Sequence, residues 1–375
     1  MSDPAAWKVL EAAMTRRRLL GGAGSAVLVS LSGGLLAACG GGGGGASASA
    51  NGPGTIKLGG YEGWIGSHEF ADFAKTNPGS SVEQVVIAVD AERITKMATD
   101  PSAVDIMLLT ESDVGRLVAL NVAQDVDLAK VPNYKHVDPF FKIGYASEKQ
   151  RKCVATDYGK TGFGYRKDLV KERPASWADM WKLAPKYSGK VTLLDYEMMT
   201  IASTLKMLGY SGSSKDEAEI QKAGEKLIEI KPHLQSFTSS NTTKGLLDGS
   251  VVMAMDWDYD MFTAMRENPN IEWVTPEDGT VGYLDTWVPI NRSKHLDVVW
   301  EFFDFHFDPK NYGDFINTTG AAFCEPAARK YIHPEIARSP VMYPSKQILD
   351  RVEFLKPVDT AQQYYDQVWQ QVKAA

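Results

Sequence analysis

Histidine and cysteine are scarce in this chain, which has six histidines and three cysteines among 375 residues. The histidines are scattered and lack the spacing of a zinc site. The sequence also lacks the His-Glu-x-x-His, Gly-x-Ser-x-Gly, Gly-x-Gly-x-x-Gly and phosphate-loop motifs. These absences argue against a metal centre, a bound cofactor and the common hydrolases. The composition therefore favours a protein that is not an enzyme, with an exported enzyme kept as the alternative because a fold alone does not exclude catalysis.

An excess of basic residues is also absent, since 40 Lys and Arg stand against 47 Asp and Glu for a net charge of −7. An acidic surface argues against nucleic acid as a partner. It is compatible with a cationic ligand, although net charge speaks mainly to solubility and steering. Aromatic residues make up 10% of the chain and include nine Trp. That is more than packing alone requires, so we expect some of these rings to face a ligand.

The only long uncharged apolar stretch, 19–38, directly follows Arg16, Arg17 and Arg18. Glycines and serines dilute this stretch, so an export signal over 1–38 is a better interpretation than a membrane-spanning helix. The paired arginines indicate the twin-arginine route, which carries folded proteins, with an ordinary secretory signal as the alternative. Either Met1 or Met14 serves as the start.

The signal ends in Leu36-Ala37-Ala38-Cys39, which resembles the bacterial lipobox. The resemblance implies cleavage before Cys39 and a lipid anchor on its thiol. Residues 40–54 are almost entirely Gly, Ser and Ala, so 39–54 is predicted to be a lipidated cysteine followed by a flexible linker. The folded part is therefore expected outside the cytoplasm, held near the extracytoplasmic face of a membrane.

Removing the signal leaves 337 residues with a net charge of −9, because the signal itself carries +2. A chain of this length exceeds the usual size of one hydrophobic core and predicts two lobes. Only Cys153 and Cys324 remain beyond the anchor. An oxidising compartment permits a disulfide between them, and two buried free thiols are the alternative.

Short apolar runs alternate with helix-like segments through the mature chain, which is typical of an α/β fold. Strands are expected at 55–58, 104–109, 251–255 and 282–290, and a helix is expected to begin at Ser176 with an acid three residues on. Polar and aromatic residues follow the second and third of these strands, at 110–113 and 256–260. Strand ends of this kind form the ligand-binding face of open α/β sheets.

Several short segments together resemble the spermidine/putrescine-binding proteins of polyamine ABC importers, which have the two-lobed type II periplasmic-binding-protein fold. The resemblance covers 56–373, and its most specific segments are 176–181, 208–212, 255–257, 284–285 and the region around 327–330. It implies a hinge between the lobes. Lobe 1 would comprise 55–160 and 283–330, and lobe 2 would comprise 161–282 and 331–375.

In that family, aromatic rings sandwich the methylene chain of the ligand and carboxylates bind its ammonium groups, both of which are favourable interactions for a cation. The resemblance implies the following ligand-binding residues here: Tyr61, Trp64, Thr110, Trp257, Tyr283 and Asp285. Two family carboxylates are replaced by Tyr196 and Met199, and a cage tyrosine is replaced by Ser112. A second tier of candidates therefore comprises Glu62, Ser112, Tyr196 and Asp258, with Glu111, Asp195 and Glu197 also nearby.

The resemblance implies a monomer that captures a small cationic solute by lobe closure and delivers it to a membrane permease, without a cofactor or metal. Another solute in the same fold is the main alternative, such as ferric ion, an amino-acid derivative or a sugar. Tyr364 and Tyr365 could chelate iron as phenolates, but their spacing with Val368 and Trp369 favours packing of a C-terminal helix. An envelope scaffold without a ligand is a further alternative.

Overall fold

The computed structural model describes residues 52–87, 90–142, 151–238 and 242–375. The predicted export signal, the lipid site at Cys39 and most of the linker 39–54 lie outside the described residues. Among the helices that are described, none is both long and apolar enough to cross a membrane.

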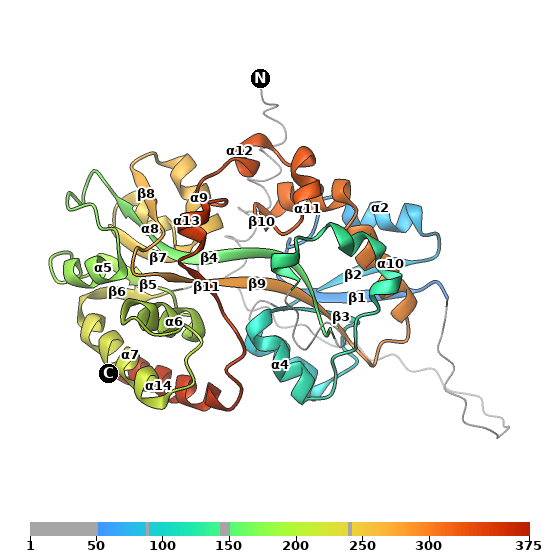
Figure 1. Ribbon diagram of the computed structural model, residues 1–375, viewed down its shortest axis with the longest axis horizontal. Coiled ribbons are helices and arrows are strands. Elements are labelled where there is room, and N and C mark those ends of the chain that lie inside the picture. Colours follow the sequence, from blue (N-terminus) through green and yellow to red (C-terminus); the bar gives the residue numbers. More distant parts are fainter. Residues whose placement is uncertain (1–51, 88–89, 143–150, 239–241) are drawn as a thin grey trace, which may run out of the picture.

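The strands form two groups that are joined through the middle of the molecule (Figure 1), in the overall order β2-β1-β3-β9-β4-β7-β5-β6. In the first group, β1 pairs in parallel with both β2 and β3. In the second group, β5 pairs in parallel with β6 and β7. The bounds are β1 Thr55–Gly60, β2 Ser81–Val86, β3 Ile106–Thr110, β5 Val191–Leu193, β6 Leu234–Phe237, β7 Met253–Trp257 and β8 Ile271–Val274.

Two long antiparallel strands, β4 (Val154–Arg166) and β9 (Thr280–Pro289), connect the groups. The first half of β4 pairs with β9, and its second half pairs with β7 and β8. The opposite edge of β9 pairs with β3. Two short strands complete the sheet, β10 (Ala322–Phe323) on β4 and β11 (Val352–Phe354) on β9. This arrangement confirms the predicted α/β, two-lobed fold.

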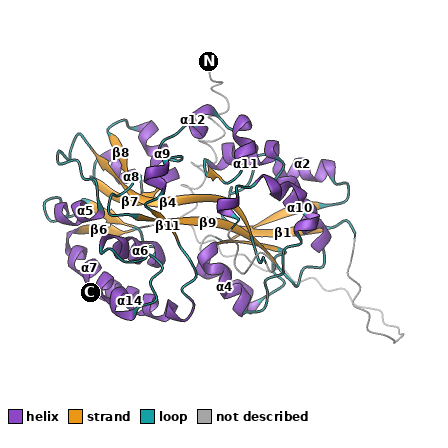
Figure 2. Cartoon of the chain, viewed as in Figure 1, coloured by secondary structure: helices purple, strands orange, loops and turns teal. Residues whose placement is uncertain are grey.

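Helices cover both groups of strands (Figure 2). Around the first group lie α2 Glu69–Thr76, α3 Asp90–Thr99, α4 Glu111–Ala119, α10 Leu296–His306, α11 Pro309–Thr319 and α12 Pro334–Ala337. Around the second lie α5 Trp177–Leu183, α6 Glu197–Met207, α7 Glu217–Ile230, α8 Lys244–Asp248, α9 Asp258–Glu267 and α14 Gln362–Ala374, with α13 Lys346–Leu349 in the connecting C-terminal segment. The predicted cap of α5 is confirmed, because the Ser176 hydroxyl accepts a hydrogen bond from the Asp179 amide at 3.0 Å.

Each group of strands has its own hydrophobic core. Around the first, Trp287 stacks on Phe302 and lies 4.2 Å from the His306 ring, centroid to centroid. Around the second, Trp177 and Tyr365 are fully buried. Two large cores are what a mature chain of this length was expected to need, and two smaller clusters lie beside β3 and α4 and around α9.

The C-terminal segment contributes to both cores. Residues Ile332, Ile336 and Met342 pack in the first core, whereas Leu355 and the buried face of α14 pack in the second. The expected boundary placed all of 331–375 in lobe 2. The apolar side chains up to Met342 nevertheless belong to the first core. The division into hinged lobes itself stays a prediction.

The two cysteines of the folded part are both buried and are not joined in a disulfide. Cys153 lies in a small core beside β3 and α4, and Cys324 lies in the first core. The sequence left open a disulfide or two buried thiols, and the structure has two buried thiols.

The packing of β9 against β4 can be tested at Gly159 of β4. A Cβ atom at this position would overlap the Tyr283 hydroxyl and ring on the paired strand. Because Tyr283 is buried, Gly159→Ala should destabilise the fold by about 1–3 kcal/mol, measured by urea unfolding. Gly52→Ala, where the space is open, is the control. An unchanged unfolding midpoint for Gly159→Ala would contradict the packing described here.

Candidate functional site

A row of polar side chains crosses the three strands where the two groups meet. Thr110 of β3 faces Asp285 of β9, and Asp285 faces Asp157 of β4. Residues that lie directly opposite each other in a sheet project from the same face. All three are at most 5% exposed. Two buried carboxylates opposite each other repel, so this row favours a cation or a proton between them.

Tyr283 lies two residues before Asp285 on the same face of β9 and covers Gly159 of the neighbouring strand. Burial raises the pKa of the Tyr283 hydroxyl, and the negative charges of Asp258, Asp285 and Asp157 raise it further. The phenol therefore stays protonated, and it has three carboxylates within electrostatic reach. Such a hydroxyl beside acidic groups suits the binding of a cation.

Asp157 is held by two hydrogen bonds, from the Trp64 indole N–H at 3.2 Å and from the Thr156 hydroxyl at 3.1 Å. Burial nevertheless raises its pKa to about 7, and the charge of Asp258 adds to this effect against the two hydrogen bonds. The carboxyl therefore changes its charge near neutral pH. A cation arriving beside it would favour the ionised form.

A continuous series of aromatic rings leads from the first group of strands to the second. Tyr61 and Trp64 follow β1, with ring centroids 6.1 Å apart. Trp64 lies 5.4 Å from Tyr259, which is stacked on Trp257 at 6.5 Å. Trp257 in turn meets Tyr196 edge-on at 6.3 Å. The junction of β7 and α9 supplies the two central rings, because the chain turns there between Trp257 and Tyr259.

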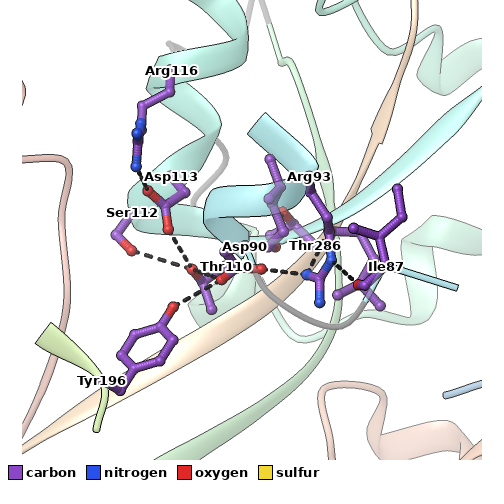
Figure 3. Close-up of polar contacts among 11 residues, drawn as sticks. Ile87, Asp90, Arg93, Thr110, Ser112, Asp113, Arg116, Tyr196 and Thr286 are labelled. Atoms are coloured by element: carbon purple, nitrogen blue, oxygen red, sulfur yellow. Dashed lines mark hydrogen bonds and ion pairs between the residues drawn. The ribbon is translucent and has the colours of Figure 1, made fainter. Parts of the chain in front are cut away.

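Two charged residues of α3, Asp90 and Arg93, join the ends of this series. Figure 3 shows them together with Tyr196, which is one of the two ends. The Tyr196 hydroxyl donates to Asp90 at 2.8 Å, and Thr110 donates to the same carboxylate at 3.2 Å. Asp90 forms an ion pair with Arg93, whose guanidinium lies 3.9 Å from the centroid of the Tyr61 ring. We call Tyr61, Trp64, Tyr259, Trp257, Tyr196, Asp90 and Arg93 the aromatic circuit. Both lobes contribute to it.

Asp258 lies beside the aromatic circuit but is engaged within the protein. Its carboxylate accepts a hydrogen bond from Lys160 at 2.7 Å, and both side chains are at most 1% exposed. Lys160 also donates to the Val341 carbonyl. Breaking this pair would leave an uncompensated buried charge, so Asp258 is a structural partner of Lys160 in this arrangement.

The structure brings most of the predicted site residues together. The aromatic circuit and the polar row contain five of the six first-tier residues, and the sixth, Tyr283, lies beside the row. The five are Tyr61, Trp64, Thr110, Trp257 and Asp285, and the circuit also contains Tyr196 of the second tier. Ser112 lies next to the row, with its hydroxyl 3.4 Å from that of Thr110. Glu62 is exposed in the turn after β1. Whether these residues bind a ligand stays a prediction.

Four residues of the site were missed by the sequence analysis: Asp90, Arg93, Asp157 and Tyr259. Tyr259 belongs to the acidic and aromatic segment after β7, which was a usable signal. Asp157 lies in a strand that alternation did not reveal, because β4 is buried along nearly its whole length. Asp90 and Arg93 are three residues apart, as in an ordinary helical ion pair, and only the fold places them against Tyr61 and Tyr196.

The iron-binding alternative finds no support from the pair Tyr364 and Tyr365. Tyr365 is fully buried, its hydroxyl donates to the Ser214 carbonyl at 2.8 Å, and burial raises its pKa. Within the described ranges, no group of three His, Cys, Asp or Glu side chains is placed to hold a metal ion. Tyr365 therefore packs α14 against the second core.

Residues 70–342 match the family model described as bacterial extracellular solute-binding protein. The chain belongs to this family. Family membership makes it a solute-binding protein that works outside the cytoplasm, rather than an enzyme.

Curated relatives of this solute-binding protein include a spermidine/putrescine-binding periplasmic protein of Salmonella typhimurium, 27% identical over 72% of this chain and 78% of that protein. A putrescine/cadaverine-binding protein of Pseudomonas aeruginosa is 24% identical over 79% of this chain and 87% of its own. Among solved structures, a spermidine/putrescine ABC transporter protein from Listeria monocytogenes superposes with a TM-score of 0.77 at 21% identity, covering 85% of this chain and 98% of that one.

The raised pKa of Asp157 predicts a pH-dependent stability. Its pKa is 3.8 in an unfolded reference and about 7 in the folded solute-binding protein. Between about pH 4 and 7 the folded state therefore holds a proton that the unfolded chain has lost. The contribution of this residue to stability is present below that window and falls as the pH rises through it.

Asp157→Asn removes the titration but keeps an acceptor for Trp64. In thermal melts, the melting temperature of the variant relative to that of the wild type should increase as the pH rises from 5 to 8. Comparison with the variant is needed because burial also raises the pKa of Glu111 to about 7 and that of Glu325 to about 8. A melting-temperature difference that stays constant over this range would show that Asp157 does not titrate there.

Proposed function

We propose that this protein captures a small cationic amine, specifically a polyamine such as putrescine or spermidine, between its two lobes. The observation that carries the proposal is the juxtaposition of the aromatic circuit with the buried carboxylates Asp157 and Asp285. Aromatic faces attract cations by about 0.5–2 kcal/mol each, and hydrogen bonds to charged groups contribute about 1.5–3 kcal/mol.

The relatives support the same ligand class. The Salmonella protein is named for spermidine and putrescine, and the Pseudomonas protein for putrescine and cadaverine. All of these ligands are flexible chains of methylene groups with charged amino groups. An apolar chain between rings and an ammonium group beside a carboxylate match the two kinds of surface that the site presents.

Lobe closure is the proposed mechanism. Tyr196 from lobe 2 and Asp90 from lobe 1 form a direct hydrogen bond, and Trp64 and Tyr259 form a ring contact between the same two lobes. We infer that these contacts belong to a closed state, which a ligand favours by binding it more tightly than the open state. The closed form would then dock on a membrane permease.

Twin-arginine export and a lipid on Cys39 complete the proposal. Arg16 and Arg17 precede the apolar signal, and Cys39 lies at its end, before the Gly-rich linker. Such a linker would hold the lobes close to the membrane that carries the permease while leaving them free to close.

Asp285 provides the direct test of the amine site. Asp285→Asn should weaken putrescine binding by at least about 2 kcal/mol, roughly 30-fold, because a charged hydrogen-bond partner of the ammonium is lost. Isothermal titration calorimetry measures the effect. The matched control is Asp297→Asn, which removes a partly exposed carboxylate that is paired with Lys130 and is not one of the site residues. An affinity unchanged by Asp285→Asn would remove this residue from the ligand site.

The anchor has its own test. Cys39→Ala should move the protein from the membrane fraction to the soluble extracytoplasmic fraction, because stable attachment requires the lipid chains. Fractionation with immunoblotting measures the distribution, and Ser47→Ala in the linker is the control. A variant that stays with the membrane would show that the lipid is not on Cys39.

A further inference from the structure

Arg93 presents a cation inside the site itself. Its side chain is fully buried, and its guanidinium is stacked on Tyr61, ion-paired with Asp90 and hydrogen-bonded to the carbonyls of Leu108 at 3.0 Å and Ile87 at 2.8 Å. An aromatic face, a carboxylate and backbone carbonyls are the groups that would bind the end of a polyamine. Arg93 therefore occupies a position in which all three kinds of cation-binding group are present.

The position is continuous with the proposed ligand site. Tyr61 is a first-tier ligand residue, and Asp90 is shared with Tyr196 of the other lobe. Burial acts to lower the pKa of Arg93, but Tyr61, Asp90 and Asp285 together raise it, so Asp285 is near enough for its charge to act on the guanidinium. The internal cation and the expected amine site thus share the electrostatic field of Asp285.

Two carboxylates of the polar row lie opposite each other, those of Asp157 and Asp285. The neighbouring carboxylates of Asp90 and Asp258 each already hold a cation of the protein, Arg93 and Lys160 respectively. The two row carboxylates match the two charges of a diamine. Without Arg93, Asp90 would be a third carboxylate for the ligand, which matches the three charges of a triamine.

We propose that Arg93 is a specificity-determining residue that fills the third cation position of the site, so that the protein selects a diamine over a triamine. This inference rests on the proposed amine-binding function and narrows it. A triamine such as spermidine would have to place its extra ammonium group where the guanidinium already lies, against like charge and without a carboxylate to receive it.

The test is Arg93→Met, which keeps an apolar stem over Tyr61 and removes the charge. Calorimetry of wild type and variant with putrescine and spermidine should show putrescine binding more tightly to the wild type. In the variant, the ratio of the two dissociation constants should move toward spermidine by at least about tenfold, the effect of one charged contact. The matched control is Arg116→Met, which breaks the neighbouring ion pair with Asp113, also three residues apart. The control should leave the ratio unchanged.

Two safeguards keep the test decisive. Arg93→Met leaves the buried Asp90 without its cation, so the double variant Asp90→Asn/Arg93→Met is prepared as well. The double variant lacks the carboxylate and should not gain spermidine binding. The wild type alone is a second measurement that requires no variant to fold: spermidine binding more tightly than putrescine would overturn the proposal.

The outcomes separate this inference from the proposed function. If the wild type binds putrescine and Arg93→Met does not shift the ratio, Arg93 is only structural and amine binding stands. If the wild type binds neither amine but Arg93→Met binds spermidine, the cation position is real and amine binding by the natural protein is refuted. If no form binds either amine, both proposals fail.

Discussion

The site depends on the repulsion between two carboxylates buried side by side. Asp157 and Asp285 lie opposite each other on β4 and β9, the two strands that connect the lobes. Burying like charges in the sheet is unfavourable unless a proton or a cation compensates them. Burial, with the charge of Asp258, raises the pKa of Asp157 to about 7, so its carboxyl is partly protonated near neutral pH. A cationic ligand at this site would replace the proton on Asp157. Ligand binding would then act directly on the two strands that connect the lobes.

The same strands also position the groups that the proposed closure would affect. Thr110 of β3 continues the row of Asp285 and donates to Asp90, which receives Tyr196 from the other lobe. A displacement between the lobes would therefore change the hydrogen bonds around Asp90. The neighbouring carboxyl of Asp113 has a pKa raised to about 6, first by burial and then by the charge of Asp90. Electrostatically interacting acidic groups thus extend from the polar row through Asp90 to Asp113 of α4.

Internal cations set how much of this acidity is left for a ligand. Lys160 and Arg93 each lie fully buried against one aspartate, and each also donates to backbone carbonyls, which fixes their positions. If Arg93 fills a cation position of the ligand site as proposed, the site would accept a ligand of lower charge.

The sequence by itself determined the α/β class, the main strands, the capped helix at Ser176 and the aromatic and acidic candidates Trp257, Tyr283 and Asp285, because local patterns and a family resemblance carry that information. Only the tertiary structure decided that Cys153 and Cys324 are separate buried thiols and that the C-terminal segment is shared between two cores. It also decided that Asp157 faces Asp285 and that Arg93 lies on Tyr61. The physical reason is that these contacts join residues distant along the chain, and their register and packing are set by the whole sheet rather than by any local sequence pattern.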